Sequence, residues 1–387
     1  MQDGLKKKIN IAFFFEKFGT WEGEKNYLYS LISAVDEYSY DDLKINIITS
    51  KKLSNYFKSL KLKNTKIIES RFFETGSILN YFRKVLSKIF NKFDPLILYY
   101  IKKYKVDLIS HYTPFFFCKT ICWTPDFQHI HLTENFSEKE IARRNKLYNN
   151  IIDNADLVLL SSKNSINDLK KYTKKKINYK KLNFVPKINL DIIKKKNIKK
   201  KYNLKKYFIV PNQFWKHKNH IILAKSIAKL KNKNFNFKIV LTGDSISQNG
   251  NFFFFEFMRE IKKKKLESYF VYLGRVPYAD LICLIDKSHS VINPSFFEGW
   301  STSVEEAKIL NKIVILSNIK VHKEQNPKMS YYFDPKNSNE LSKKIYQVSK
   351  IRSNKFKKFD FIKKNYIIDR IKFAKNYAKI VKELYYI

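Results

Sequence analysis

Short apolar runs alternate with amphipathic segments along the whole chain. The apolar runs are compact and rich in Ile, Val, Leu and Phe, which is typical of buried strands. They predict strands at 9–15, 44–49, 66–68, 107–110, 120–123, 157–160, 207–211 and 238–243. Helical spacing predicts helices at 25–35, 78–93, 221–230, 279–288 and 365–384 and from about Glu138. Strand and helix repeat in both halves, which predicts two doubly wound α/β domains.

The length of 387 residues favours two domains over one. Two lysine-rich stretches, 174–181 and 194–201, are typical of solvated connectors. We therefore expect one domain over 1–190 and a second that begins at 191.

The formal charge of +41 comes with many Lys, Asn, Ile, Phe and Tyr and only 8 Gly. This joint bias indicates compositional drift rather than one selected basic face. We expect no specific nucleic-acid partner, because no nucleic-acid-binding signature accompanies the charge. Attraction to anionic lipid or to phosphorylated ligands remains a physical consequence of it. Three cysteines, no apolar run of membrane-spanning length and a polar start without a signal peptide indicate a cytoplasmic protein.

Segment 291–307 combines an apolar strand, a loop containing Glu298 and Gly299, and the start of a helix after Ser301, Thr302 and Ser303. A helix N-terminus attracts anions through its free N–H groups and its dipole. Two carboxylates, Glu298 and Glu306, next to such a site suit a ligand with phosphates and hydroxyls, as in a nucleotide-sugar. Spacing alone leaves a second interpretation equally open. Ser303 and Glu306 could form a capping box, in which Ser303 is the N-cap and Glu306 only caps its own helix.

The same segment resembles the Glu-seven-residues-Glu signature of retaining glycosyltransferases of family four, the glycosyl transferases group 1. The residues after it also fit, from Ala307 and Lys308 to 312–315, 318–324 and 332–335. This resemblance implies the GT-B fold: two Rossmann-like domains that face an interdomain cleft. It assigns 1–190 to the acceptor, with helix 365–387 crossing back onto it, and 191–364 to the nucleotide-sugar donor.

The resemblance also implies roles for residues of the second half. Glu306 would bind the ribose hydroxyls and Glu298 the hydroxyls of the transferred sugar. Lys218 matches a lysine that grips the donor diphosphate, while Gln213 stands where the family usually has an arginine. The remaining expected contacts are Gly274 and Arg275 near the base and Ser301, Thr302 and Ser303 at the phosphates.

Two islands of the first half resemble the family as well. Gly23 belongs to a partial match, 19–27, with the glycine loop that faces the donor phosphates. Asp126 and His129 follow a strand in a recurrent pattern near the acceptor and the donor sugar, so we expect them in the catalytic site. Taken alone, a lone histidine is more often structural.

No Asp-x-Asp occurs, which disfavours a metal-dependent GT-A enzyme and predicts a reaction without metal or other cofactor. Lys218 and the N–H groups near Ser301 would instead stabilise the departing diphosphate. The resemblance implies same-face attack with retention, on a glycan or lipid-linked glycan acceptor in surface polysaccharide or lipopolysaccharide synthesis. An epimerase or phosphorylase, a non-catalytic nucleotide-sugar-binding component and a basic nucleic-acid binder are the alternatives.

Helix 78–93 has its apolar residues, among them Ile78, Phe82 and Ile89, on one stripe, with lysines elsewhere. Packing against the sheet of its own domain is the favoured interpretation. The alternative is an interfacial helix on an anionic membrane. That alternative would place the protein peripherally on the inner face of the plasma membrane.

Overall fold

The computed structural model describes residues 7–17, 22–90, 93–231, 233, 235–246, 250–351 and 359–386. The chain divides into two compact units, Met1–Lys187 with Ile368–Ile387, and Ile188–Ile367. The division falls three residues before the boundary expected from the lysine-rich stretches. Each unit is described below by itself.

In its described part, the first unit contains a seven-stranded parallel sheet in the order β3-β2-β1-β4-β5-β6-β7. The strands are β1 (Ile9–Phe15), β2 (Leu43–Thr49), β3 (Thr65–Glu69), β4 (Leu108–Ser110), β5 (Thr120–Thr124), β6 (Leu157–Leu160) and β7 (Tyr179–Lys181). The connecting helices are α1 (Glu22–Tyr38), α2 (Lys51–Ser59), α3 (Ile78–Ile89), α4 (Pro95–Tyr104), α5 (Gln128–His131), α6 (Glu138–Asn154) and α7 (Lys163–Tyr172). Short 3₁₀ turns, η1 (Arg71–Phe73) and η2 (Thr133–Asn135), complete the unit.

The second unit has a six-stranded parallel sheet among its described residues, in the order β10-β9-β8-β11-β12-β13. Its strands are β8 (Tyr207–Pro211), β9 (Lys238–Thr242), β10 (Phe270–Tyr272), β11 (Ser290–Asn293), β12 (Val314–Ser317) and β13 (Ser330–Phe333). Its helices are α8 (Ile192–Lys195), α9 (Ile198–Lys201), α10 (Ile221–Ala228), α11 (Phe252–Lys263), α12 (Tyr278–Lys287), α13 (Thr302–Ile309), α14 (Lys320–Gln325) and α15 (Ser338–Ser349), with η3 (Lys216–Lys218) and η4 (Glu267–Tyr269).

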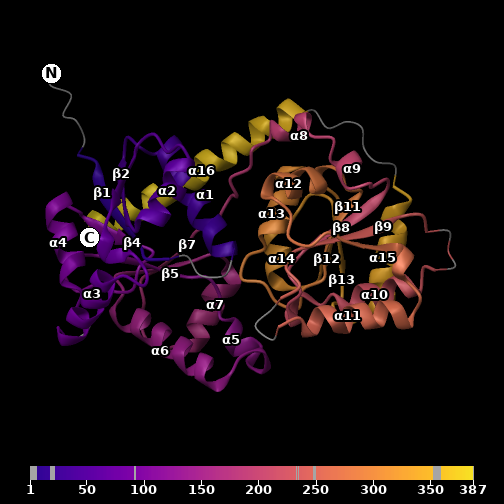
Figure 1. Cartoon of the computed structure of the whole chain (residues 1–387), viewed down its shortest axis with the longest axis horizontal. Helices are drawn as coiled ribbons and strands as arrows, with labels where there is room; N and C mark the ends of the chain where they lie inside the picture. Colours follow the sequence, from indigo (N-terminus) through magenta and orange to yellow (C-terminus); the bar gives the residue numbers. More distant parts are fainter. Residues whose placement is uncertain are drawn as a thin grey trace. The chain divides into compact units, whose positions relative to one another are not determined.

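Helices cover both faces of the second sheet (Figure 1). Helices α10, α11 and α15 pack on one face, where Ile222, Phe257 and Ile345 join one buried apolar cluster with the strands. Helices α12, α13 and α14 lie on the other face. A strand buried on both faces must be apolar throughout, which is why the apolar runs at 207–211 and 238–243 correctly predicted β8 and β9.

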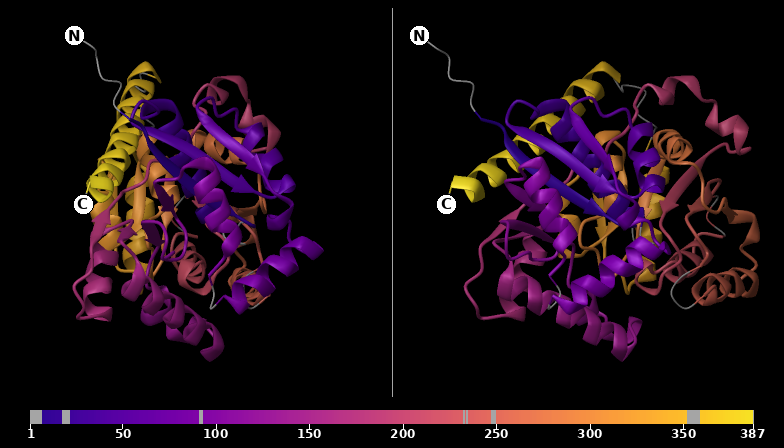
Figure 2. Two further views of the ribbon diagram at one scale, coloured as in Figure 1. Left: turned by 90° about the vertical axis from the view of Figure 1, so that its left-hand side faces the viewer. Right: turned by 60° about the vertical axis from the view of Figure 1, so that its left-hand side comes forward.

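The C-terminal helix α16 (Phe359–Tyr386) belongs to the first unit from Ile368 onward. Figure 2 shows it beside the first strands of that unit. Buried polar contacts hold it there: the Arg370 guanidinium donates to the Ser30 carbonyl at 2.6 Å, and the Tyr377 hydroxyl donates to Ser110 Oγ at 2.7 Å. The predicted fold, two Rossmann-like domains with a last helix that returns to the first, is confirmed.

Helix α3 contradicts the favoured interpretation of its apolar stripe. The side chains of Ile78, Phe82 and Ile89 are 86%, 53% and 68% exposed. The helix instead buries Asn80 and Arg83. The Asn80 amide donates to the Phe72 carbonyl at 2.7 Å, and Arg83 forms ion pairs with Glu16 and Asp94. Because these polar contacts anchor the helix, its apolar stripe faces outward.

Candidate functional site

The candidate residues of the second unit lie where the sheet order reverses. The chain passes from β8 to β9 and β10 on one side, and β11 lies on the other side of β8. In open parallel sheets, the crevice at the carboxyl ends of such strands is the usual ligand site. The loop after β8 contains Gln213 and Lys218, and the loop after β11 contains Glu298.

Lys218 and Glu298 form a buried ion pair across these two loops. Lys218 Nζ donates to both carboxylate oxygens of Glu298, at 2.7 and 2.9 Å. Burial alone would raise the pKa of the Glu298 carboxyl, but the Lys218 ammonium holds that pKa at about 2. Glu298 is therefore a carboxylate at neutral pH and can accept hydrogen bonds only.

Asn293, the last residue of β11, organises the polar groups around this pair. Its side-chain amide donates to Ser301 Oγ at 3.0 Å and to Glu298 Oε1 at 3.3 Å. Its carbonyl oxygen accepts from Ser295 Oγ at 2.7 Å and from the Asn212 amide at 3.3 Å. Sequence analysis missed Asn293; a polar residue that ends an otherwise apolar strand was the available signal.

Glu306 lies in the helix that follows and has different surroundings. Its side chain is 2% exposed, and the Tyr278 hydroxyl of α12 donates to its Oε1 at 2.9 Å. Burial raises the pKa of Glu306 to about 8, although the Tyr278 hydrogen bond acts in the opposite direction. The N-cap of α13 is Ser301, so the capping-box interpretation with Ser303 as the cap is wrong.

The N-terminus of α13 is held in place by side chains from elsewhere. In the described chain, the Ser301 side chain makes no capping hydrogen bond and lies 3.2 Å from Ser303 Oγ. Gln325 of α14 fixes the backbone of Ser301, donating to its carbonyl at 2.8 Å and accepting from its N–H at 3.3 Å. With Thr302 as its first residue, the helix presents a firmly positioned end of the kind that attracts phosphate.

Glycines bring the other loops close to the β8 loop. Gly243, after β9, has φ +108°, and a Cβ there would lie 2.7 Å from the Asn212 carbonyl oxygen and 2.9 Å from the Gln213 nitrogen. Only glycine fits so close to another backbone. Gly274, after β10, accepts from the Gly243 N–H at 2.9 Å. Its neighbour Arg275 is exposed and lies 3.8 Å from the Asp244 carboxylate.

Three predicted site residues belong to the first unit. Gly23 is the second residue of α1, and 18–21, which include Gly19 of the proposed loop, lie outside the described residues. Asp126 accepts from the Gln128 N–H at 2.9 Å, so its carboxylate supports the start of α5. His129 is buried, its Nε2 lies 3.1 Å from Asn145 Oδ1, and burial lowers its pKa.

The structure thus brings Lys218, Glu298, Ser301 and Ser303 into one polar network and places Asp126 and His129 in a group of their own. Another residue that sequence analysis missed, His322 of α14, is buried beside Glu298, and burial lowers its pKa to about 4. Among the residues that the structure describes, no three His, Cys, Asp or Glu side chains cluster as a metal ion would require.

Comparison with known proteins shows what this chain is similar to. Residues 191–365 match the family model Glycosyl transferases group 1. The whole chain resembles a glycosyltransferase from Rickettsia africae (17% identity, TM-score 0.65, 98% of this chain and 99% of that one). It also resembles Anabaena HepE in complex with UDP and glucose (16% identity, TM-score 0.66, 97% and 100%). These similarities confirm the predicted GT-B fold.

One curated relative, the Staphylococcus aureus protein CapJ, is 26% identical over 188 residues. The match spans 46% of this chain and 46% of CapJ, so it covers about half the length of each protein. No helix in the described part of the chain combines the length and apolar character needed to cross a bilayer.

Proposed function

We propose that this protein transfers a sugar from a nucleotide-diphosphate sugar to a glycan or lipid-linked glycan, with retention of anomeric configuration. The observation that carries the proposal is the Lys218–Glu298 ion pair beside the N-terminus of α13, at the reversal point of the donor-unit sheet. The solved complexes of HepE with UDP and with UDP-glucose, proteins of the same fold, support a nucleotide-sugar as ligand.

In this proposal each residue acts through its charge and its hydrogen bonds. Lys218 and the N–H groups at Ser301, Thr302 and Ser303 stabilise the diphosphate as it departs, without a metal ion. Glu298, an ionised acceptor held by Lys218, binds hydroxyls of the transferred sugar. A carboxylate tied to an ammonium through both oxygens is a poor nucleophile, which favours same-face attack over a double displacement.

The remaining residues contact the acceptor and the nucleotide and phosphate parts of the donor. Glu306 binds the ribose hydroxyls, Gly274 and Arg275 lie at the base, and Gly23 and Gln213 complete the phosphate loops. Asp126 and the neutral His129 take part in the transfer from the first unit, where the acceptor binds.

A thermal-stabilisation experiment tests the donor site. We expect one of UDP, GDP or ADP, or its sugar conjugate, to stabilise the wild type by roughly 2.7 kcal/mol at about 100 times its dissociation constant. Glu306→Ala should lose most of this response, while Glu267→Ala, at an exposed glutamate of η4, should keep it. Equal stabilisation of all three proteins by polyanions alone would instead assign binding to the charge of +41.

Transfer of labelled sugar distinguishes the enzyme from a second candidate, a non-catalytic nucleotide-sugar-binding component. Gln213 in place of the family arginine favours this candidate, because it removes one positive charge from the diphosphate site. Hydrolysis or transfer of the sugar from the bound donor, lost in Glu298→Gln, supports the enzyme. Tight binding with no turnover under any acceptor condition supports the binding component.

We further propose that the first unit contacts an anionic membrane through α3, as a cytoplasmic protein of surface polysaccharide synthesis. The exposed stripe of Ile78, Phe82 and Ile89 lies near the exposed Lys84 and Lys88 on the same helix. Vesicles with about one-third anionic lipid should bind the wild type and release Phe82→Ser at moderate salt. Phe361→Ser, an exposed phenylalanine of α16, is the matched control and should bind normally.

A further inference from the structure

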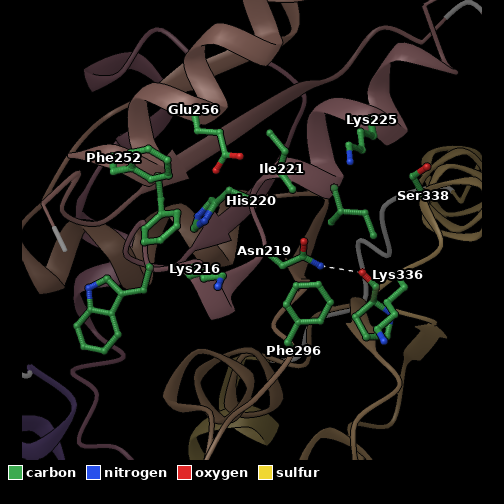
Figure 3. Close-up of a pocket in the computed structure, with 14 residues that line it drawn as sticks. Lys216, Asn219, His220, Ile221, Lys225, Phe252, Glu256, Phe296, Lys336 and Ser338 are labelled. Carbon is green, nitrogen blue, oxygen red and sulfur yellow. Dashed lines mark hydrogen bonds between the residues drawn. The ribbon is translucent and has the colours of Figure 1, made fainter. Parts of the chain in front are cut away.

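The second unit contains a cavity of about 490 Å³ that the proposed donor site does not use. Its walls come from η3, the starts of α10 and α11, Phe296 after β11, and 335–338 before and in α15 (Figure 3). Among the described residues, Lys218, Glu298, Glu306, Gly274 and Arg275 do not line it. Its volume falls in the range of small-molecule sites, about 300–1,000 Å³.

Aromatic rings form much of the wall. Trp215, Phe252, Phe253 and Phe296 line the cavity, and Phe252 is 60% exposed. The four consecutive phenylalanines at 252–255 do not all line the cavity. Phe254 packs instead against Phe214 and Tyr272, with its ring centroid 5.0 and 4.8 Å from theirs. The partly buried Phe254 packs on the core, whereas Phe252 and Phe253, which meet edge to face with centroids 5.2 Å apart, line the cavity.

A buried polar atom also lies in the cavity wall. His220 is 5% exposed and stacks on Phe214 at 4.1 Å between centroids. Burial lowers its pKa to about 3, so the ring is neutral. In the described structure its Nε2 is buried and has no hydrogen-bond partner. A buried polar atom without a partner costs free energy, which a ligand hydroxyl would recover because it can either donate or accept.

Charged side chains complete the lining. Lys225 of α10 and Lys336 lie across the cavity from Glu256 of α11 (Figure 3). Among the described residues, none of these three side chains forms an ion pair or hydrogen bond. With Lys216 of η3, three lysines and one carboxylate line the cavity, and with Ser338 they favour a ligand that has hydroxyl groups and a negative charge.

We propose that this cavity is a second ligand site that binds a pyranose ring bearing a carboxylate or phosphate group. The C–H face of the sugar stacks on Phe252 and Trp215, a hydroxyl satisfies His220, and the anion lies between Lys225 and Lys336. A lipid chain fits less well, because it would leave His220 and the charged side chains without partners. Such a ring can come from an acidic glycan or from a free sugar phosphate. This site is independent of the proposed donor site.

Calorimetric titration of the full chain, with UDP present to occupy the donor site, tests the proposal. The probes are a hyaluronan tetrasaccharide, which contains glucuronate, glucose 6-phosphate, neutral maltotetraose and inorganic phosphate. We expect one of the two acidic sugars to bind, and the tighter of them identifies the source as a glycan or a sugar phosphate. Binding of inorganic phosphate as tight as that of either acidic sugar, or no binding of either, overturns the proposal.

Matched variants locate the binding. Phe252→Ala should lower the affinity for the acidic sugar about five- to tenfold, which is the effect of losing one aromatic contact. Phe255→Ala, at an exposed position of the same helix, should leave the affinity unchanged. Lys336→Gln should weaken it similarly, and the exposed Lys343→Gln of α15 should not. An unchanged affinity in Phe252→Ala and Lys336→Gln overturns the site. Failure of UDP to bind in any of these proteins would count against the donor site and not against this cavity.

Discussion

The regions around Glu298 and Glu306 differ in charge although both carboxyls are buried in one loop-helix segment. Glu298 has the Lys218 ammonium against both oxygens and a pKa of about 2. Among the described residues, Glu306 has the Tyr278 hydroxyl as its one side-chain partner, and its pKa is about 8. The partner, and not the spacing, decides whether a buried carboxyl is charged.

This difference assigns the two carboxyls different tasks. Glu298 is ionised before any ligand arrives, so it can bind sugar hydroxyls without a change of protonation. Glu306 is protonated at neutral pH in the free protein, and in the proposed function it releases its proton to accept hydrogen bonds from two ribose hydroxyls.

The largest effect is expected for Lys218→Met. The change leaves the Glu298 carboxylate buried without its cation, which typically costs about 3–5 kcal/mol of unfolding free energy. The pKa of Glu298 should rise, so the loss should be greater at pH 8 than at pH 5. Urea unfolding measures it, with the exposed Lys229→Met of α10 as control. The double variant Lys218→Met, Glu298→Gln should regain stability, and a single variant as stable as the wild type would contradict the pair's role.

Gly243→Ala should have the next largest effect, confined to the region of Glu298. The new Cβ meets the Asn212 carbonyl at 2.7 Å and requires a φ of +108°, so we expect a loss of about 1–3 kcal/mol and weaker nucleotide binding. Gly76→Ala, with φ +85° and no atom within 4 Å of its Cβ, adds only the backbone strain. Equal losses in the two variants would show that the close approach to Asn212 is unimportant.

A pH effect on nucleotide-sugar affinity should come from Glu306. Affinity for UDP-glucose should increase by up to tenfold per pH unit between about pH 6 and 8 and level off above, since binding requires the carboxylate. In the free protein the pKa of Glu306 is raised from 4.5 to about 8, so the contribution of Glu306 to stability is lost as pH rises from 4.5 to 8. Glu306→Gln should abolish the pH dependence of affinity and remove this contribution to stability. A flat affinity profile for the wild type would show that Glu306 binds as the neutral acid.

The smallest effect is expected for Tyr278→Phe. Loss of its hydroxyl removes a hydrogen bond that lowers the pKa of Glu306, so the affinity profile should move to higher pH by less than about one unit. Titrations with UDP-glucose at several pH values measure the shift. The region of Glu298 should be unaffected, as should the profile of Tyr269→Phe, a control outside the site. A shift to lower pH would reverse the assigned role of the hydroxyl.

The sequence predicted the strands better than the contacts of the helices. A strand buried on both faces, such as β1 or β8, needs a continuous apolar run, and the run itself locates it. Helix α3 has an equally clear stripe, but periodicity shows only that a helix has an apolar face. Which face is buried depends on Arg83, whose partners Glu16 and Asp94 are brought to it by the fold.

For the candidate site, resemblance located Lys218, Glu298 and Glu306, but their charge states and supporting residues required coordinates. Tyr278 is one of 25 tyrosines and lies 28 residues before Glu306, so spacing offers no reason to pair them. Asn293 was visible as a polar residue at a strand end, yet its partners come from the loop after β8, the loop after β11 and the start of α13. The resemblance predicted Asp126 in the catalytic site. The structure shows its carboxylate accepting a hydrogen bond from the backbone N–H of Gln128, the first residue of α5.

The contact of Arg370 with the start of the chain constrains the order in which the molecule can be built. Its guanidinium is buried and donates to the carbonyls of Ser30 and Val185 and to Ser33 Oγ. Ser30 and Arg370 are 340 positions apart. During synthesis the first unit emerges first but lacks this partner until the last helix has left the ribosome. The second unit, Ile188–Ile367, is continuous in sequence and can fold before the last helix is made. The unit that is synthesised first therefore completes its folding last.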